Sequence, residues 1–225
     1  MPDLTLLYYS ANALSDVVSN NFRNELLRVV GDTYPIISVT QKPVSFGKNI
    51  CVGEIGQSYY NLYKQMLAGL EHVETRYVAT IEDDTLYTTE HLAHRPTSDD
   101  TIAYNRSMYF LDSHEFWTRG GTGTFGMIAP TAVLRSCLKR RYEKFPVEMM
   151  PRVYHKYFFM DPGQDDRCGL PNEKTEQFTT EIPLITLCYY GATFGRPKRH
   201  NQTSSGCTDL SHWGNAEVLR KKLHS

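Results

Sequence analysis

In the first half of the chain, short apolar runs alternate with segments of helical periodicity. Residues 4–9 and 35–40 are uncharged apolar runs, which are typical of buried parallel strands. Residues 14–30 and 57–72 place apolar side chains at the 3.6-residue spacing of a helix, and residues 76–84 form a strand that ends in acids. This β-α-β-α-β order predicts a parallel sheet with helices on both faces.

The second half of the chain is less regular. It predicts a hairpin or strand pair, a helix, a buried strand and a short closing helix, at residues 101–105 with 108–111, 131–142, 183–190 and 215–223. Residues 145–181 are rich in Pro, Asp and aromatic side chains and show little period. Since no stretch resembles a linker, we expect a single α/β domain with a mixed, mainly parallel sheet.

Composition narrows the class of protein. The 225 residues are 40% apolar and 22% charged, which is ordinary for a globular chain, and the net charge of −1 excludes a wholesale basic coat for nucleic acid. We find no signal peptide and no run of about 18 apolar residues, and therefore expect no membrane anchor. The five scattered cysteines include no CxxC pair, which indicates reduced thiols and a cytoplasmic location.

The strongest chemical signal is Glu82-Asp83-Asp84 at the end of an apolar strand. In open α/β sheets, ligands bind outside the carboxyl ends of the strands. Three adjacent carboxylates repel one another unless a cation or hydrogen-bond donors compensate, and a divalent metal that also touches a diphosphate would do so. A capped, solvated turn is the alternative interpretation.

A histidine near the C-terminus is the second signal. His212 lies in the sequence Asp-Leu-Ser-His-Trp-Gly, between a polar loop and the last expected helix. An imidazole beside carboxylates suits Mn²⁺ better than Mg²⁺. A helix cap or a surface residue is the alternative, and His200 is a weaker candidate ligand.

Several features occur together: YYS at 8–10, a helix opening at 56–58 with Asn61, TIEDD at 80–84, a Gly-rich stretch before FGMIAP, and the late His-Trp-Gly. Together they resemble a GT-A fold glycosyltransferase, closest to small family-two-like enzymes of bacteria and bacteriophages. The likeness covers residues 4 to about 130, and 183–214 loosely. Glu82 and Asp84 have the spacing of the family's DxD motif, with Glu in the first place.

The resemblance implies roles for these residues. It places Asp84 and His212 on a Mn²⁺ or Mg²⁺ ion, and Glu82, with Asp83 beside it, on the donor. Residues 1–95 would then form the half that binds a nucleotide-sugar, most simply a UDP-sugar, and residues 96–225 the half that binds a hydroxyl acceptor. Asp165 or Asp166 would be the general base, although a helix cap or turn is the alternative there.

The end of the first strand predicts the nucleotide pocket. Tyr8, Tyr9 and Ser10 are placed to stack on a base and to hydrogen-bond with it, but one tyrosine should face the core because successive strand residues point to opposite faces. Further donor candidates are Asn12, Gln41, Asn61, Lys64 and Gly121. Lys64 would meet a phosphate or be solvated, and Gly121 would let the backbone approach the sugar or form a tight turn.

Basic residues suggest an acceptor. Residues 196–225 hold six Lys and Arg against two acids, and residues 139–141 are a second basic cluster. These could bind DNA phosphates, clamp a diphosphate, or be solvated helix ends. We predict Trp117, Arg196, Lys198 and Arg199 as acceptor-binding residues.

The favoured acceptor is a hydroxymethylated pyrimidine in phage-type DNA, and a cell-surface polysaccharide or other glycan is the alternative. A non-catalytic nucleotide- or sugar-binding module is the rival outside enzymes. A nucleotidyltransferase would be expected to have a Gly-rich phosphate loop with a basic residue right after the first strand, and YYSANALSD has neither Gly nor Lys.

Overall fold

The computed structural model describes residues 2–118, 121–147, 161–189 and 206–225. The elements of the first half are β1 (Leu4–Ser10), α1 (Asp16–Val30), β2 (Ile36–Thr40), β3 (Lys48–Cys51), α2 (Tyr59–Leu70), β4 (Tyr77–Glu82), β5 (Thr85–Leu86) and α3 (Thr89–Ala93). Those of the second half are β6 (Thr101–Asn105), β7 (Met108–Leu111), β8 (Phe116–Trp117), η1 (Thr124–Gly126), β9 (Met127–Pro130), α4 (Thr131–Lys144), η2 (Asp165–Cys168), β10 (Lys174–Phe178), β11 (Leu184–Leu187), β12 (Gly206–Cys207), β13 (Asp209–Leu210), β14 (Gly214–Asn215) and α6 (Ala216–His224).

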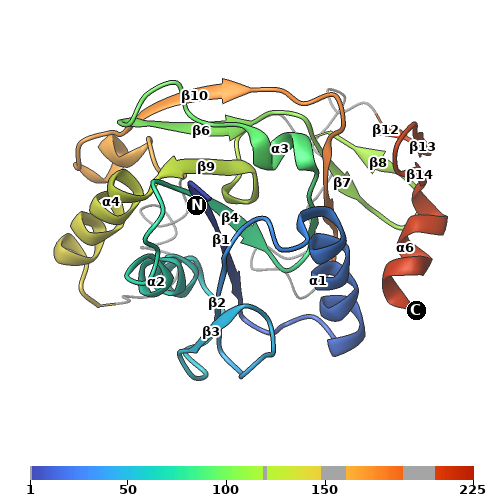
Figure 1. The fold of residues 1–225 in the computed structure, drawn as a ribbon, viewed down its shortest axis with the longest axis horizontal. Helices are drawn as coiled ribbons and strands as arrows, with labels where there is room; N and C mark the ends of the chain where they lie inside the picture. The colour runs from blue at the N-terminus through green and yellow to red at the C-terminus, as the bar shows by residue number, and fades with distance from the viewer. Residues whose placement is uncertain (1, 119–120, 148–160, 190–205) are drawn as a thin grey trace.

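A seven-stranded sheet with the order β10-β6-β9-β4-β1-β2-β3 forms the centre of the molecule (Figure 1). Strands β4, β1, β2 and β3 run parallel, and β9 runs antiparallel to both of its neighbours. The expected α/β fold with a mixed, mainly parallel sheet is therefore confirmed. In the β1–β4 register Tyr9 pairs with Glu82, so the acids that follow β4 lie beside Ser10 at the end of β1.

Alternation along β1 divides the core between the two faces of the sheet. Leu7 and Tyr9 pack with α2 and α4 on one face, whereas Leu6 and Tyr8 pack with α1 and α3 on the other. This follows from the two-residue period of a strand, and it decides which of the two adjacent tyrosines is free to border a site on the α2 side.

Capping sets the limits of the two long helices of the first half. The Ser15 side chain accepts a hydrogen bond from the Val18 amide at the start of α1, and Gly31, at a φ of 50°, ends that helix. Ser58 caps α2 in the same way, accepting from the Asn61 amide. Both helices thus begin and end within two residues of the limits that the apolar pattern predicts.

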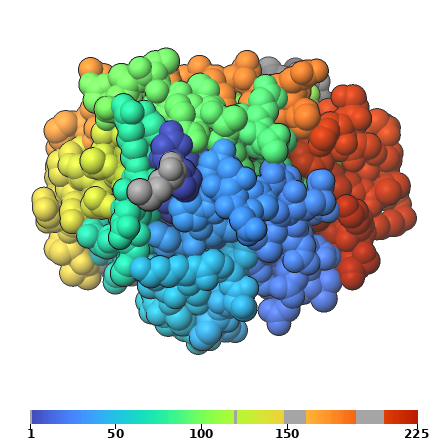
Figure 2. All heavy atoms as spheres, viewed as in Figure 1, coloured from blue at the N-terminus to red at the C-terminus, as the bar shows by residue number. Residues whose placement is uncertain are grey.

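A second sheet, β12-β8-β7-β11-β5, packs with α1 and α6. The C-terminal α6 lies directly against α1, where the Asn21 amide donates to the Leu223 carbonyl and Lys222 pairs with Glu25 (Figure 2). The expected pairing of residues 101–105 with 108–111 is wrong: β6 belongs to the large sheet and β7 to the small one. Each strand finds its partners far along the chain, which a local pattern does not reveal.

Close packing at Gly69 seats α2 on the sheet. A Cβ at this position would come within 2.3 Å of Leu7 Cδ1 and 2.7 Å of Val39 Cγ2. We expect Gly69→Val to lower the free energy of unfolding by about 1–3 kcal/mol, because extra methyl groups overpack the core. Urea unfolding measures the change, with Lys64→Val on the exposed face of the same helix as the control. Equal stability of the two variants would contradict the tight packing.

Candidate functional site

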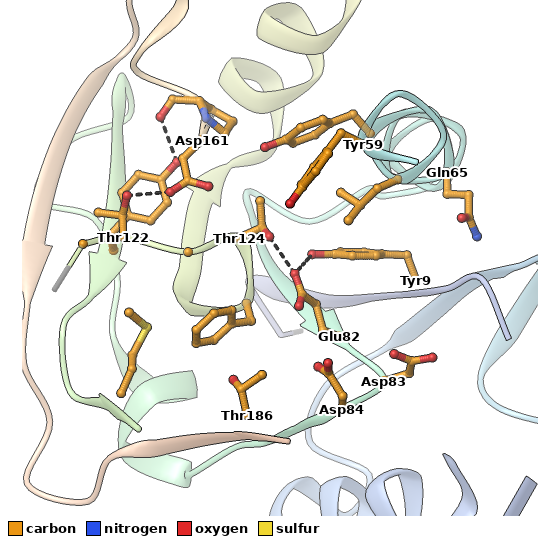
Figure 3. A pocket seen from close by; sticks show the side chains of 18 of the residues that line it. Tyr9, Tyr59, Gln65, Glu82, Asp83, Asp84, Thr122, Thr124, Asp161 and Thr186 are labelled. Atoms are coloured by element: carbon orange, nitrogen blue, oxygen red, sulfur yellow. Dashed lines mark hydrogen bonds between the residues drawn. The ribbon is translucent and has the colours of Figure 1, made fainter. Parts of the chain in front are cut away.

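A cavity of about 600 Å³ opens where β1 and β4 end (Figure 3). This volume lies in the usual range for small-molecule sites, and the carboxyl edge of a parallel sheet is where such ligands bind. Its walls come from the ends of β1 and β4, the start of α2, the η1 turn, the segment 161–164, and strands β6, β7, β10 and β11. The cavity therefore lies between the two sheets and draws on both halves of the chain.

The acids after β4 line the base of this cavity (Figure 3). Glu82 Oε1 accepts hydrogen bonds from the Tyr9 hydroxyl at 2.8 Å and from Thr124 Oγ1 at 2.6 Å. Asp83 accepts from the Ser10 hydroxyl. Asp84 accepts only a longer bond from Thr85 Oγ1, at 3.2 Å, among the bonds the structure gives its side chain. Of the three, Asp84 is thus the least compensated.

Burial makes the negative charge of these groups costly. Desolvation raises the pKa of Glu82 to about 7 and also raises the pKa of Asp83. Burial raises the pKa of Asp84 well above its ordinary value, and the neighbouring Glu82 and Asp83 carboxylates raise it further. In the described lining of the cavity, the cationic side chains are Arg106 and Arg167, both exposed. Outside this lining, the Arg23 guanidinium offsets part of the rise in the pKa of Asp83, which leaves Glu82 and Asp84 as the acids short of positive charge.

The donor set fits a divalent cation only in part. Within the described ranges, no three His, Cys, Asp or Glu side chains form a ready metal-binding group. Mg²⁺ and similar hard cations are commonly held by one or two carboxylates together with substrate phosphates and water. Buried carboxylates with raised pKa values suit that arrangement, with Asp84 as the first ligand and a bound diphosphate supplying others.

His212, the other predicted metal ligand, does not line this cavity. It is exposed at the turn between β13 and β14, with its ring edge-on to Trp213, and borders a separate small hollow near α1. The structure does not bring it to the cavity that Asp84 lines, because the Trp213 indole anchors this turn to the Pro183 carbonyl at 2.8 Å. The alternative ligand His200 lies outside the described residues.

The two adjacent tyrosines separate as strand alternation requires. Tyr9 borders the cavity, whereas Tyr8 is buried on the opposite face of the sheet, with its ring edge-on to Phe46 at 5.0 Å. Ser10 also lines the cavity. Tyr9 and Ser10 thus remain candidates for nucleotide contact, and Tyr8 is a core residue.

Three predicted donor residues shape the wall of the cavity by bonding to backbone. Gln41 uses both ends of its amide on Gly56, donating to the carbonyl at 2.8 Å and accepting from the N–H at 3.1 Å. Asn61 donates to the carbonyls of Ile55 and Gly56. Asn12, at a φ of 56°, accepts from the amides of Gln41 and Lys42. Gln41 and Asn61 thus fix the loop before α2, and Asn12 holds the backbone of Gln41 itself.

The two remaining candidates for donor binding differ in position. Gly121 lines the cavity at a φ of 127°, where glycine is favoured, whereas Lys64 is exposed on α2 and lies outside the described lining. Gln65, which the sequence did not single out, donates to the carbonyls of Ser10 and Val39 and so ties α2 to the ends of β1 and β2.

On the acceptor side, the acid that lines the cavity is Asp161 and neither Asp165 nor Asp166. Asp165 forms a buried ion pair with Arg141, at 2.5 Å, and does not line the cavity. Asp166 is exposed on η2 and also lies outside the lining. The expectation that either meets an acceptor is not supported by these positions. Asp161 does line the cavity and accepts from Thr122 Oγ1 at 2.5 Å (Figure 3). Sequence reasoning missed it because it stands in an aperiodic segment, with Asp-Pro-Gly as its only turn signal.

The other acceptor candidates are placed as follows. Trp117 is buried and stacks on Phe110, which lines the cavity, so Trp117 supports the wall from behind. Arg196, Lys198 and Arg199 lie outside the described residues.

The basic cluster at 139–141 is paired with acids. Lys139 meets Glu71 at 2.9 Å, Arg140 pairs with Glu173, and Arg141 is buried against Asp165. The cluster is therefore not an open patch of positive charge for phosphates.

No family model and no curated protein matches the sequence. Solved structures with a similar fold include S. aureus TarS in complex with UDP-GlcNAc, at 10% identity and a TM-score of 0.49 over 90% of this chain and 60% of that one. Another is the apo form of the glycosyltransferase GlyE of Streptococcus pneumoniae TIGR4, at 12% identity and a TM-score of 0.49 over 100% of this chain and 61% of that one. A glycosyltransferase involved in glycosylation of the major capsid of PBCV-1 is similar over 83% of this chain and 93% of its own (6%, 0.47). The chain spans about three fifths of the TarS and GlyE chains. At these values the likeness concerns the fold.

A membrane-spanning helix is absent from the described part of the chain, where no helix is both long and apolar enough to cross a bilayer.

The buried acids predict a pH-dependent gain in stability when one charge is removed. The pKa of Asp84 is raised in the fold. The contribution of this side chain to the free energy of unfolding is therefore fully present below the ordinary pKa of an aspartate, and it is lost as pH rises through the raised pKa. In EDTA at pH 8, Asp84→Asn should therefore raise the free energy of unfolding by about 1–3 kcal/mol, with a smaller gain at pH 5.

Urea unfolding at the two pH values measures this gain. Asp32→Asn, at an exposed site, is the matched control and should change stability little at either pH. A loss of stability in Asp84→Asn at pH 8 would show that Asp84 is compensated in the fold.

Proposed function

We propose that this chain is a metal-dependent glycosyltransferase that moves a sugar from a nucleotide-sugar, a UDP-sugar, to a hydroxyl acceptor. The observation that carries the proposal is the group of three buried acids at the base of a cavity of about 600 Å³, at the carboxyl end of parallel strands. A nucleoside diphosphate bound with a divalent cation would bring the positive charge that these acids lack and would fill a cavity of this size.

The residues of the cavity base have separate tasks in this proposal. Asp84, whose bond from Thr85 is the longest among those the structure gives the three acids, would hold Mn²⁺ or Mg²⁺ together with the donor's phosphates. When bound, the cation neutralises the leaving diphosphate. Glu82, whose one oxygen is held by Tyr9 and Thr124, is oriented to accept a donor hydroxyl with the other.

Asp161 is the acid suited to activate the acceptor. It borders the same cavity from the opposite wall, where the Thr122 hydroxyl orients it. Transfer breaks the bond between the anomeric carbon and the diphosphate oxygen and forms a bond to the acceptor oxygen. The acceptor's proton passes to Asp161, which replaces Asp165 and Asp166 as the proposed base.

Experiment must distinguish DNA from a glycan as the acceptor. In the C-terminal helix Arg220 donates to the Leu111 and Cys188 carbonyls, and Lys221 pairs with Glu217 within the helix. The hydroxymethylated-DNA acceptor therefore remains a hypothesis on Arg196, Lys198 and Arg199, which would contact the DNA phosphates.

The direct test incubates the protein with Mn²⁺ and a panel of nucleotide-sugars and measures release of free nucleoside diphosphate. Hydroxymethylated DNA and oligosaccharides are supplied as alternative acceptors. We expect turnover that EDTA abolishes and that Asp84→Asn lowers by at least about a hundredfold, because the leaving diphosphate loses its counter-charge.

Asp32→Asn, an exposed Asp-to-Asn change, is the control and should keep full activity. Turnover undiminished in EDTA would overturn the metal requirement. Binding of a nucleotide-sugar without any turnover would favour a non-catalytic binding module.

The two tyrosines of β1 provide a matched pair for the nucleotide site. We expect Tyr9→Leu to weaken binding of UDP by roughly 5- to 150-fold, the range that corresponds to about 1–3 kcal/mol of base stacking. Tyr8→Leu should lower stability and leave UDP affinity unchanged, because Tyr8 packs in the core on the other face. Calorimetry with UDP measures both, and equal affinities of the two variants would place the base elsewhere.

A further inference from the structure

A buried ion pair lies behind the acceptor wall of the cavity. Arg141 on α4 donates from Nε to Asp165 Oδ1 on η2 at 2.5 Å, and each side chain is 1% exposed. Neither residue lines the cavity. In the described part of the chain the pair is therefore separated from a ligand in this cavity, and its effect passes through the residues that it touches.

The first contact of the pair is with the wall segment 161–164. Asp165 Oδ2 accepts the Gly163 N–H at 3.0 Å. The Tyr104 hydroxyl donates to the neighbouring Pro162 carbonyl at 2.8 Å. Two consecutive residues that border the cavity are thus fixed by buried side chains, immediately after Asp161.

Close packing limits the same segment from the other side. Gly163 has a φ of 99°, and a Cβ there would come within 2.3 Å of Thr175 Cγ2 and 3.4 Å of the Glu173 carbonyl oxygen. The segment passes tightly against Thr175 of β10, so position 163 has no room for a side chain.

The second contact of the pair is with α2. The Arg141 guanidinium lies over the Tyr63 ring, 5.0 Å from its centroid. Tyr63 is on α2 and also borders the cavity. One guanidinium thus supports two walls of the same cavity.

Stability alone does not explain such a pair. Removing two charges from water costs about as much as their attraction returns, and apolar residues of similar volume often serve as well or better. What apolar residues cannot do is accept the Gly163 N–H and thereby fix the wall.

From these contacts we infer that Arg141 and Asp165 are positioning residues that hold the segment 161–164 so that Asp161 faces the acceptor. The inference rests on the proposed function for its effect on transfer, but not for its effect on the wall itself. It predicts a fault in turnover rather than in donor binding, because the donor's cation and phosphates are held at the other end of the cavity.

The decisive variant is the double replacement Arg141→Met/Asp165→Leu, since either single replacement leaves one buried charge alone. We expect a folded protein with a Tm close to that of the wild type, a donor KM within about twofold, and a kcat for transfer that is ten- to a hundredfold lower, roughly the effect of displacing a reacting group by about 1 Å. Hydrogen exchange at the Gly163 amide should become faster.

Tyr104→Phe is a second, milder variant that removes only the hydroxyl bond to Pro162, and it decides the matter if the double variant does not fold. It should lower kcat by up to about tenfold with the donor KM unchanged. Tyr34→Phe, which removes a tyrosine bond to the Leu92 carbonyl away from the cavity, is the matched control and should leave kcat unchanged.

Wild-type kcat and wild-type exchange at Gly163 in the folded double variant would overturn the inference. So would parallel losses of donor binding and kcat. If the double variant does not fold, wild-type kcat in Tyr104→Phe would overturn it. If the wild type transfers no sugar, hydrogen exchange at the Gly163 amide still decides whether the wall is held as inferred. It is measured in the double variant, or in Tyr104→Phe if the double variant is unfolded. Failure of the proposed function is therefore recognised separately.

Discussion

Three neighbouring carboxylates are buried at the end of β4, and the cost of desolvating their negative charge is the constraint that the surrounding groups must offset. Hydroxyl groups of Tyr9, Thr124 and Ser10 compensate Glu82 and Asp83, while Asp84 has the weakest support of the three. Burial raises the pKa of each acid, which means that the fold alone stabilises the charged forms poorly. A chain gains little stability from such a group, and the proposed cation with its bound diphosphate would bring the compensating positive charge.

The fold holds these acids by linking strand ends to helices through side-chain amides and hydroxyls. Gln65 on α2 binds the carbonyls at the ends of β1 and β2, and Gln41 with Asn61 fixes the loop that enters α2. On the other side of the cavity, the buried Arg141–Asp165 pair does the same for the wall after Asp161. The cavity is therefore bordered by backbone segments that are each held from outside it.

The sequence predicted the fold where apolar periodicity is strong. The β-α-β-α-β half, α4 and α6 appear within a few residues of their expected limits, because each buries a regular apolar face. Strands β3 and β10 were missed, since these edge strands carry exposed and polar side chains. The apolar β6 and β7 were found but paired wrongly, because their partners are distant in sequence.

For the site, the sequence indicated the acids at the end of β4. It also indicated that one of Tyr8 and Tyr9 faces the core, which strand alternation explains. It did not predict that the side chains of Gln41, Asn61 and Asn12 bond to backbone and fix a loop, nor that Asp161 rather than Asp165 borders the cavity. A carboxylate in an irregular segment gives no periodic signal, and only the position of Arg141 on α4 reveals which aspartate is buried.

The measurement that tests the central claim most directly is calorimetric titration of Mn²⁺ into the wild-type protein with and without UDP. The account predicts weak binding of Mn²⁺ alone and binding at least about tenfold tighter in the presence of UDP, because the buried acids and the diphosphate share the cation. Equal Mn²⁺ affinity in both titrations, or UDP binding that is unchanged in EDTA, would contradict it.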